Sequence, residues 1–280
     1  MSVEFHIQKH LGKAVASKQS VGSGLFSAYQ IQLKNGGKVF IKYQKTASQQ
    51  LINEGKSLTL LGKTIHTPKV LGACEFCLIL EWISPNNNPN LQAQAGAELA
   101  LLHQNTAPFF GFDFDNNIGT TPQKNAPDKQ IESWKKFYWQ YRLLFQIQLA
   151  YQNNHLNEGE YQRLLSVENQ LEKLLADGIQ PSLLHGDLWS GNLLSGKAHP
   201  YFIDCACYYG HREIDLALTF MFGGFSNDFY HNYNKIYPLE TGFERRKPLY
   251  MLYHYLNHLN IFGGSYHANV LDCYEQINSI

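Results

Sequence analysis

The residues best suited to chemistry lie between Leu183 and Asp204. Asp187 follows an apolar run, Asn192 follows five positions later, and Asp204 ends a second apolar run at 201–203. The apolar runs around a Gly-containing turn predict a hairpin that holds Asn192 and Asp204 on one side of a cleft. Amide and carboxylate oxygens are ligands that Mg²⁺ prefers, usually beside phosphate oxygens and waters. The stretch is therefore predicted to be a phosphoryl-transfer centre.

Asp187 is the predicted catalytic residue of this centre. A hydroxyl that attacks the γ-phosphate of ATP needs a carboxylate to orient it and to accept its proton. Asn192 and Asp204 are the predicted Mg²⁺ ligands. The pattern H-x-D-x4-N at 185–192, with a later Asp closing an apolar strand, is the catalytic-loop pattern of kinases, with Gly186 in place of the usual Arg. The alternative, a chance set of polar residues in a hairpin, does not account for four matching positions.

A glycine turn near the start of the chain is the first element that would position a nucleotide. Gly22 and Gly24 lie between two predicted strands, 14–21 and 28–33. Glycines let the backbone turn sharply and bring N–H groups close to phosphate oxygens. By itself this pattern is more typical of an ordinary hairpin, so its interpretation depends on the residues that follow.

Lys42 and Glu54 are predicted to form the ion pair that positions the phosphates. Lys42 ends the predicted strand 38–42, and Glu54 lies in the predicted helix 47–61. A strand lysine followed by a helix glutamate is the order that this pair requires. A surface lysine and a solvated glutamate are the alternatives for each residue alone.

A Pro/Asn-rich segment at 84–90 follows the apolar strand that ends near Ile83. Such a segment is typical of a linker between two lobes. We therefore predict that Glu81 to Ile83 face the adenine ring as a hinge, with a nucleotide-covering lobe at 1–83 and a catalytic and substrate-binding lobe at 84–280. A plain connecting loop is the alternative.

The remainder of the chain is predicted to be mainly helical. The stretch 107–127 is too long for a simple connection and is a candidate lid or substrate wall. Asp215, early in a predicted helix, is expected to bond N–H groups of the catalytic loop, and Arg245 to Lys247 are expected to be a solvated helix start. The predicted helices are 91–105, 130–152, 157–176, 214–222, 227–235, 244–262 and 267–278.

Composition excludes several classes of partner. The chain has 280 residues, 44% of them hydrophobic, and 23 basic residues balance 23 acidic ones. Because the net charge is zero, no overall electrostatic field attracts polyanions, and binding to nucleic acid or to an anionic membrane is not expected. No apolar stretch approaches the roughly 18 residues of a membrane helix, and the first residues lack the pattern of a signal peptide. The expected location is the cytoplasm.

The five cysteines do not suggest a disulfide framework, because their number is odd. Cys74 and Cys77 form a C-x-x-C across a predicted hairpin turn, and Cys205 and Cys207 follow the predicted metal ligand. A four-cysteine zinc site from these two pairs is conceivable, but no knuckle glycines flank them. Buried free thiols are the favoured interpretation.

Several segments resemble the fructosamine kinase family, also called ketosamine 3-kinases. The resemblance spans nearly the whole chain, and HGDL alone is shared with aminoglycoside and choline kinases. The Trp that follows HGDL and the segments MFGGF and YLNH are more specific to this family. The segments are HGDLWSGN at 185–192, YGH at 209–211, MFGGF at 221–225, YLNH at 255–258 and NIGTTPQ at 117–123.

This resemblance implies an α+β, two-lobed protein-kinase-like fold with a small β-rich N-lobe and a larger, mainly helical C-lobe. It also implies transfer of the ATP γ-phosphate, with Mg²⁺, to O3 of a ketose joined to an amine. The resulting 3-phosphate is unstable and releases the amine, so the family is associated with deglycation. The implied partner is a small-molecule ketosamine or a glycated protein lysine. Some relatives carry a regulatory cysteine in the glycine loop, which is absent from 22–26.

Trp189, Tyr209 and His258 are the predicted substrate-facing residues. An indole could cover the apolar face of the sugar and help to exclude water. Core packing of Trp189 against the catalytic loop is the alternative. Two other functions stay open, namely a kinase for another small alcohol such as an aminoglycoside or choline, and a non-catalytic kinase-like binding protein. Because Gly186 cannot clamp a phosphorylated loop, an enzyme is expected to be constitutively assembled.

Overall fold

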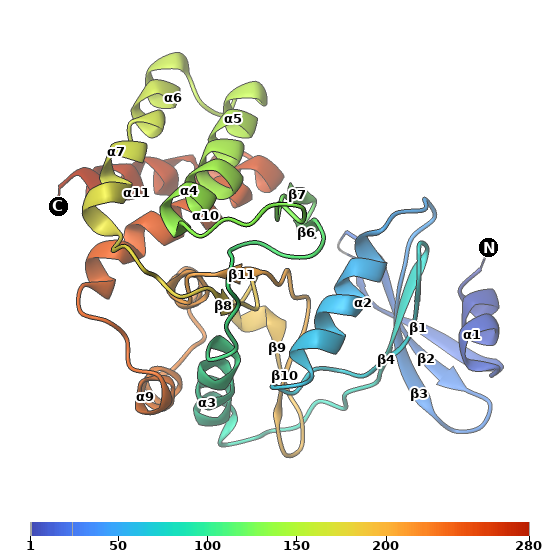
Figure 1. The fold of residues 1–280 in the computed structure, drawn as a ribbon. Helices are drawn as coiled ribbons and strands as arrows, with labels where there is room; N and C mark the ends of the chain where they lie inside the picture. The colour runs from blue at the N-terminus through green and yellow to red at the C-terminus, as the bar shows by residue number, and fades with distance from the viewer. Residues whose placement is uncertain (1, 24, 280) are drawn as a thin grey trace.

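The computed structural model describes residues 2–23 and 25–279, and its two lobes lie side by side (Figure 1). The smaller lobe is built on an antiparallel sheet of five strands in the order β1-β2-β3-β5-β4. The β2–β3 turn places Gly36 at φ +89°, a left-handed conformation that glycine adopts at little cost. The strands are β1 (Val15–Ser23), β2 (Ser27–Leu33), β3 (Lys38–Tyr43), β4 (Val70–Cys74) and β5 (Cys77–Glu81).

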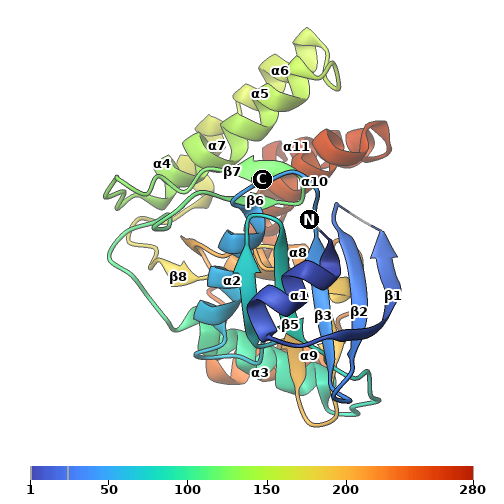
Figure 2. The ribbon, with the colours of Figure 1, turned by 90° about the vertical axis from the view of Figure 1, so that its right-hand side faces the viewer.

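Helices α1 (Val3–Leu11) and α2 (Gln50–Leu61) cover opposite faces of this sheet (Figures 1 and 2). Successive strand side chains point to opposite faces. Cys77 of β5 accordingly belongs to the buried cluster that contains Ile7 of α1, whereas Leu78 belongs to the cluster beneath α2. The β4–β5 hairpin therefore contacts both helices.

The larger lobe is mainly helical. Helix α10 packs against α5, α8 and α11, and α3 packs along α9. The helices are α3 (Leu91–His103), α4 (Trp134–Tyr138), α5 (Leu144–Gln152), α6 (Glu158–Leu165), α7 (Glu168–Leu174), α8 (Glu213–Thr219), α9 (Asn227–Ile236), α10 (Phe243–Phe262) and α11 (His267–Asn278). None of the helices in the described ranges is long and apolar enough to span a membrane. The predicted α+β fold with a β-rich N-lobe and a helical C-lobe is confirmed.

Three small two-stranded sheets, two of them hairpins, complete the larger lobe in the described ranges. One of them, β6–β7, lies within the stretch 107–127, which is therefore more ordered than a simple lid loop. The pairs are β6 (Asn116–Ile118) with β7 (Thr121–Gln123), β8 (Ser182–Leu183) with β11 (Tyr209–Gly210), and β9 (Leu193–Ser195) with β10 (Pro200–Phe202). The β9–β10 pair is the hairpin predicted between Asn192 and Asp204.

The predicted single helix over 130–152 is interrupted by a π-helical turn, η1 (Trp139–Leu143). This turn carries Arg142, which is fully buried and donates hydrogen bonds to the Lys124 carbonyl at 2.6 Å and to Asn125 Oδ1 at 2.7 Å. Its guanidinium carbon lies 3.9 Å from the Tyr208 ring centroid. The π turn thus aims a cation at the segment after β7, a tertiary requirement that apolar periodicity does not reveal.

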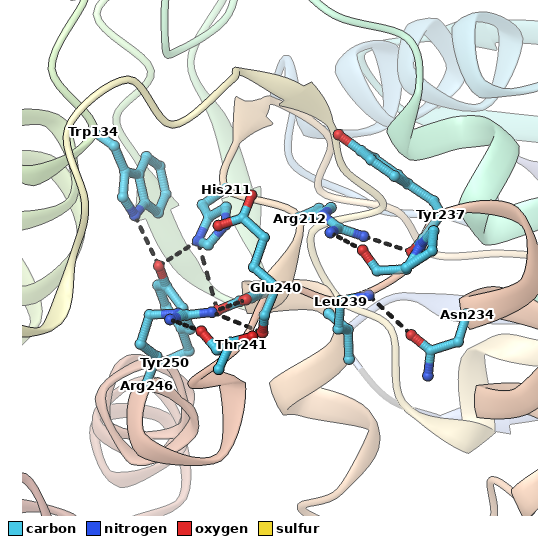
Figure 3. Close-up of polar contacts among 12 residues, drawn as sticks. Trp134, His211, Arg212, Asn234, Tyr237, Leu239, Glu240, Thr241, Arg246 and Tyr250 are labelled. Carbon is cyan, nitrogen blue, oxygen red and sulfur yellow. Dashed lines mark hydrogen bonds and ion pairs between the residues drawn. The ribbon is translucent and has the colours of Figure 1, made fainter.

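The expectation that Arg246 is solvated is wrong. Its Nε and Nη2 donate to the two carboxylate oxygens of buried Glu213 at 2.7 and 2.6 Å. Figure 3 shows Arg246 beside Thr241, whose carbonyl accepts a further bond from Nη1 at 3.0 Å. A buried carboxylate needs such a bidentate partner, because an unpaired charge is costly there. The pair anchors the start of α8, which carries Asp215.

Candidate active site

A cavity of about 430 Å³ lies between residues of the two lobes. Its polar lining includes Lys42 and Glu54 from the N-lobe and Asp187 and Asp204 from the C-lobe. Its apolar lining comes from both lobes as well and is suited to a flat, partly apolar ligand. The apolar lining residues include Val21, Ala28, Phe40, Leu80, Leu194 and Ile203.

Lys42 joins the two lobes electrostatically. Its Nζ lies 2.7 Å from Glu54 Oε1 and 2.8 Å from Asp204 Oδ1. Burial by itself disfavours the charged ammonium, but the two carboxylates outweigh burial and raise the pKa of Lys42. The lysine is therefore a permanent cation that faces the cavity.

Asn192 and Asp204 present oxygen atoms that fit a hard cation. The Asn192 Nδ2 donates to the Asp187 carbonyl at 2.8 Å and lies 3.3 Å from Asp187 Oδ2, which turns Asn192 Oδ1 away from these acceptors. Asp204 uses Oδ1 for Lys42, and Oδ2 forms no hydrogen bond within the described ranges. An amide oxygen and a carboxylate oxygen match the donor preference of Mg²⁺.

Asp204 has a left-handed backbone conformation, with φ +57°. Such a conformation is uncommon for a residue other than glycine and is found mostly where the surrounding structure imposes it. The strand β10 before Asp204 is held against β9, and the Ile203 N–H donates to the Asn192 carbonyl at 3.0 Å. The hairpin therefore fixes the direction in which the Asp204 side chain enters the cleft.

Asp187 lies beside Asn192 at the cavity. Burial, followed by the nearby Asp204 carboxylate, raises the pKa of Asp187 to about 7. A carboxylate with a pKa near neutrality is suited to accept a proton and to release it again.

The loop that carries Asp187 is held by Asp215. The Asp215 carboxylate accepts the His185 N–H at 2.7 Å and the Gly186 N–H at 2.9 Å. The buried His103 Nε2 lies 3.2 Å from the same carboxylate. Gly186 has φ +85°, and a Cβ there would lie 2.1 Å from the Ala206 carbonyl oxygen. Only glycine fits where many kinases have Arg.

The predicted nucleotide-binding residues outside the ion pair do not all reach the cavity with free polar groups. Gly22 lines the cavity, whereas Gly24 lies outside the described residues. Glu81 also lines the cavity, but its carboxylate accepts the Lys69 N–H at 2.9 Å and its own N–H donates to the Lys69 carbonyl at 3.0 Å. Ile83 lines the cavity, and neither its N–H nor its carbonyl forms a hydrogen bond in the described part of the chain.

Two of the three residues predicted to face the substrate lie in one aromatic row. The Trp189 and Phe222 ring centroids are 6.2 Å apart, and those of Phe222 and His258 are 5.0 Å apart. Trp189 is 40% exposed, and its indole lies on Gly191 of the same loop, where a Cβ would come within 2.2 Å of the ring. Both the substrate-facing and the loop-packing interpretation fit this placement. Tyr209 is not part of this row. It lies in β11, where its ring packs against Phe112 and its N–H donates to the Gly111 carbonyl.

The β6–β7 hairpin supplies cavity residues that are not among the individually predicted site residues. Asn116, Asn117 and Gly119 line the cavity, as does Gln50 from α2. The Gln50 side chain donates to the Gly119 carbonyl at 3.0 Å, which ties the hairpin to the N-lobe. The signals in the sequence were the unusual length of the stretch 107–127 and the family-like segment at 117–123.

Comparisons with known proteins cover nearly the whole chain. A family model described as fructosamine kinase matches residues 1–279. A probable ketoamine kinase of Enterococcus faecium is 45% identical over 195 residues, which are 69% of this chain and 69% of that protein. The chloroplastic protein-ribulosamine 3-kinase of Arabidopsis thaliana is 36% identical over 265 residues, which are 90% of this chain and 79% of that protein.

Solved structures lead to the same group. A crystal structure of a candidate fructosamine-3-kinase from Thermobifida fusca superposes with a TM-score of 0.91 at 29% sequence identity. The match covers 100% of this chain and 99% of that chain. The two-lobed, protein-kinase-like arrangement is therefore shared over its full length.

Proposed function

The chain belongs to the fructosamine kinase family, and from this premise we propose that it transfers the γ-phosphate of ATP to the 3-hydroxyl of a ketosamine. It is an ATP-dependent kinase, and relatives are named for ketoamines and for protein-linked ribulosamine. Loss of the unstable 3-phosphate then releases the amine, so the activity is deglycating. The grouping of Lys42, Glu54, Asp187 and Asp204 around one cavity is the observation that carries the proposal for the site.

The chemical step divides between the two lobes. Asp187 orients the sugar hydroxyl and accepts its proton as the oxygen attacks the γ-phosphorus and ADP leaves. Lys42 neutralises phosphate charge, and Glu54 holds it in position. Asn192 Oδ1 and the Asp204 carboxylate would hold Mg²⁺, which supplies further positive charge at the phosphates when bound.

The adenine ring is expected at the end of β5. The free N–H and carbonyl of Ile83 can pair with the edge of the base, and Val21 and Leu194 can cover its faces. Glu81 is expected to act through its backbone and through the Lys69 contact, since its carboxylate and N–H are already used. The lobe boundary between 83 and 84 and the cytoplasmic location stay predictions.

The acceptor is expected to lie at the aromatic row of Trp189, Phe222 and His258. An indole can cover the C–H face of a sugar while its neighbours leave the hydroxyls free. Trp189 is two residues after Asp187 in the same loop, so a sugar on this row is expected to bring a hydroxyl towards the carboxylate. Tyr209 is outside this row and is expected to contribute less to substrate binding.

A substrate panel tests the proposal directly. ATP consumption is measured with free and protein-linked ketosamines of ribulose, erythrulose and fructose, and with choline and an aminoglycoside as controls. Turnover of at least one ketosamine, with phosphorus NMR detecting a 3-phosphate, supports the function. Turnover of choline or of the aminoglycoside alone would assign the kinase to another alcohol, and ATP binding without any turnover would indicate a non-catalytic protein.

A further inference from the structure

Two histidines and two cysteines converge on the α1 face of the N-lobe sheet. His6 and His10 belong to α1, Cys74 ends β4 and Cys77 begins β5. One ligand atom from each residue lies within 4.8 Å of the others. Residues four apart on a helix share a face, and Cys74 and Cys77 are register partners across a two-residue turn. Two independent local geometries therefore present four metal-binding side chains to one point.

The distances in this cluster suit a tetrahedral ion. Cys74 Sγ lies 3.4 Å from Cys77 Sγ and 3.6 Å from His6 Nδ1. Zinc bonds of about 2.3 Å to sulfur and about 2.0 Å to nitrogen place neighbouring ligand atoms roughly 3.3 to 3.8 Å apart in a tetrahedron. One ring nitrogen of His10 lies within 4.8 Å of the other three ligand atoms.

Both histidines have a ring nitrogen that is not satisfied by the protein. The Nε2 atoms of His6 and His10 are buried and have no hydrogen-bond partner among the described residues. His6 is only 1% exposed, so water does not replace the missing partner there. Buried polar atoms without a partner are rare and require an explanation. Metal ligation would supply the missing partner of His10 Nε2. His6 would ligate through Nδ1, the ring nitrogen that lies 3.6 Å from Cys74 Sγ.

The charge of these side chains as metal ligands suits a divalent ion. Two thiolates and a divalent ion together carry no net charge, which suits the apolar surroundings of Ile7.

We propose that His6, His10, Cys74 and Cys77 bind a structural zinc ion. On binding, each thiol loses its proton to solvent and forms a Zn–S bond, and each imidazole donates a nitrogen lone pair. Four protein ligands leave no open position, as in structural rather than catalytic zinc sites. The two cysteines that follow Asp204 are not part of this group, so the four-cysteine alternative considered from the sequence is replaced by a set of two cysteines and two histidines.

The ion would fasten α1 to the strand that backs the catalytic lysine. Cys77 pairs in register with Tyr43, the residue after Lys42 on β3. Gly72 allows the close approach of the helix, because a Cβ there would lie 2.9 Å from His10 Cβ. The proposed role is therefore stabilisation of the N-lobe from the face opposite the nucleotide cavity.

Metal analysis tests the proposal. The full chain is purified with reduced thiols, incubated with zinc, freed of weakly bound ions by gel filtration and measured by inductively coupled plasma mass spectrometry. One zinc per chain is expected for the wild type and none for the double variant C74S/C77S. Matched controls are Cys273→Ser, which removes a buried thiol of α11, and His231→Gln, which removes an exposed histidine.

A second group of possible ligands requires its own control. His66, Glu98 and His199 also lie within reach of one ion, and this group is more exposed. The variant His199→Gln should leave the tightly bound zinc unchanged. Replacement of zinc by cobalt(II) tests the ligand set in the wild-type protein. A tetrahedral site with two sulfurs should give thiolate-to-cobalt charge-transfer bands and strong ligand-field bands in the absorption spectrum.

Thermal unfolding tests the structural role. A zinc chelator should lower the Tm of the wild type by roughly 5 to 15 °C and leave the Tm of C74S/C77S unchanged. Absence of zinc from the wild type, or equal zinc in the double variant, would overturn the site. A mass lower by two hydrogens, without zinc, would instead identify a Cys74–Cys77 disulfide and also overturn it. Zinc loss with an unchanged Tm would overturn the structural role.

Discussion

Lys42 and Asp204 are 162 positions apart in the chain, and their side chains meet at 2.8 Å across the cavity between the lobes. Glu54 contacts the same ammonium at 2.7 Å. The lysine–glutamate ion pair that kinases need for phosphate binding is thus formed without any phosphorylated segment. Together with Gly186, which has no side chain to bind such a segment, this contact is consistent with a constitutively assembled enzyme.

Replacing Lys42 with Met should lower kcat/KM for ATP by about 10² to 10³-fold, because one preorganised positive charge is lost at the phosphates. Methionine has a similar volume, but it leaves the buried Glu54 carboxylate without its partner, so the Tm should fall as well and is measured beside the kinetics. Steady-state kinetics measure the effect. Lys45→Met, an exposed lysine at the end of the same segment, is the matched control and should retain normal activity. A normal kcat/KM in Lys42→Met would contradict the assigned role.

Replacing Asp187 with Asn should lower kcat by about 10² to 10⁴-fold, because the amide cannot accept the hydroxyl proton. ATP affinity should change little, as expected when an interaction of the transition state is removed. Single-turnover kinetics and calorimetry separate the two quantities. Asp228→Asn, on an exposed helix position, is the control. Near-normal turnover in Asp187→Asn would exclude this residue as the base.

Replacing Trp189 with Ala should lower kcat/KM for the ketosamine by roughly 10 to 1,000-fold, because the apolar cover of the sugar is lost. Trp189→Phe should retain more activity. Tyr151→Ala, which removes another exposed aromatic ring, is the control. Equal losses of Tm, ATP affinity and turnover in Trp189→Ala would show instead that the indole is structural.

Replacing Gly186 with Ala should disrupt the catalytic loop. The new Cβ would lie 2.1 Å from the Ala206 carbonyl oxygen, in addition to the strain of φ +85°. Gly178 has φ +74° and open space around its Cβ position, so Gly178→Ala carries the backbone strain alone. We expect a cost of about 1 to 2 kcal/mol for Gly178→Ala and a larger loss, with loss of turnover, for Gly186→Ala. Urea unfolding and activity assays compare them, and equal effects would contradict the collision.

His254 should contribute to acid sensitivity. Burial and the neighbouring His258 lower the pKa of His254 to about 3, whereas an unfolded histidine has a pKa of about 6.5. The unfolded state therefore binds a proton that the folded state does not, so stability falls as the pH drops below about 6.5. His254→Leu should reduce this slope by about half of 1.4 kcal/mol per pH unit near pH 6.5 and by nearly the whole of it near pH 5.

Urea unfolding of the wild type and of His254→Leu between about pH 7 and about pH 5 measures the two slopes. The exposed His231→Gln serves as the control and should keep the wild-type slope. Identical slopes for wild type and His254→Leu would mean that this imidazole is already protonated in the folded protein.

The sequence by itself determined the parts of the site whose geometry is local. The spacing from His185 to Asn192 places Asp187 and Asn192 in one loop, and the alternation in β3 decides that Lys42 and Tyr43 face opposite sides. The order of glycine turn, strand lysine and helix glutamate then predicts the nucleotide lobe. These features depend on periodicity and turn chemistry, which are properties of consecutive residues.

Contacts between distant segments were decided only by the tertiary structure. The π turn at Arg142, the Arg246–Glu213 pair and the β6–β7 wall each depend on a partner far along the chain. His6 and Cys74 are 68 positions apart and become neighbours only when α1 packs on the sheet. Taken singly, a histidine on a helix and a C-x-x-C hairpin are ordinary core residues. Tertiary packing brings these side chains together, and local sequence patterns do not specify that packing.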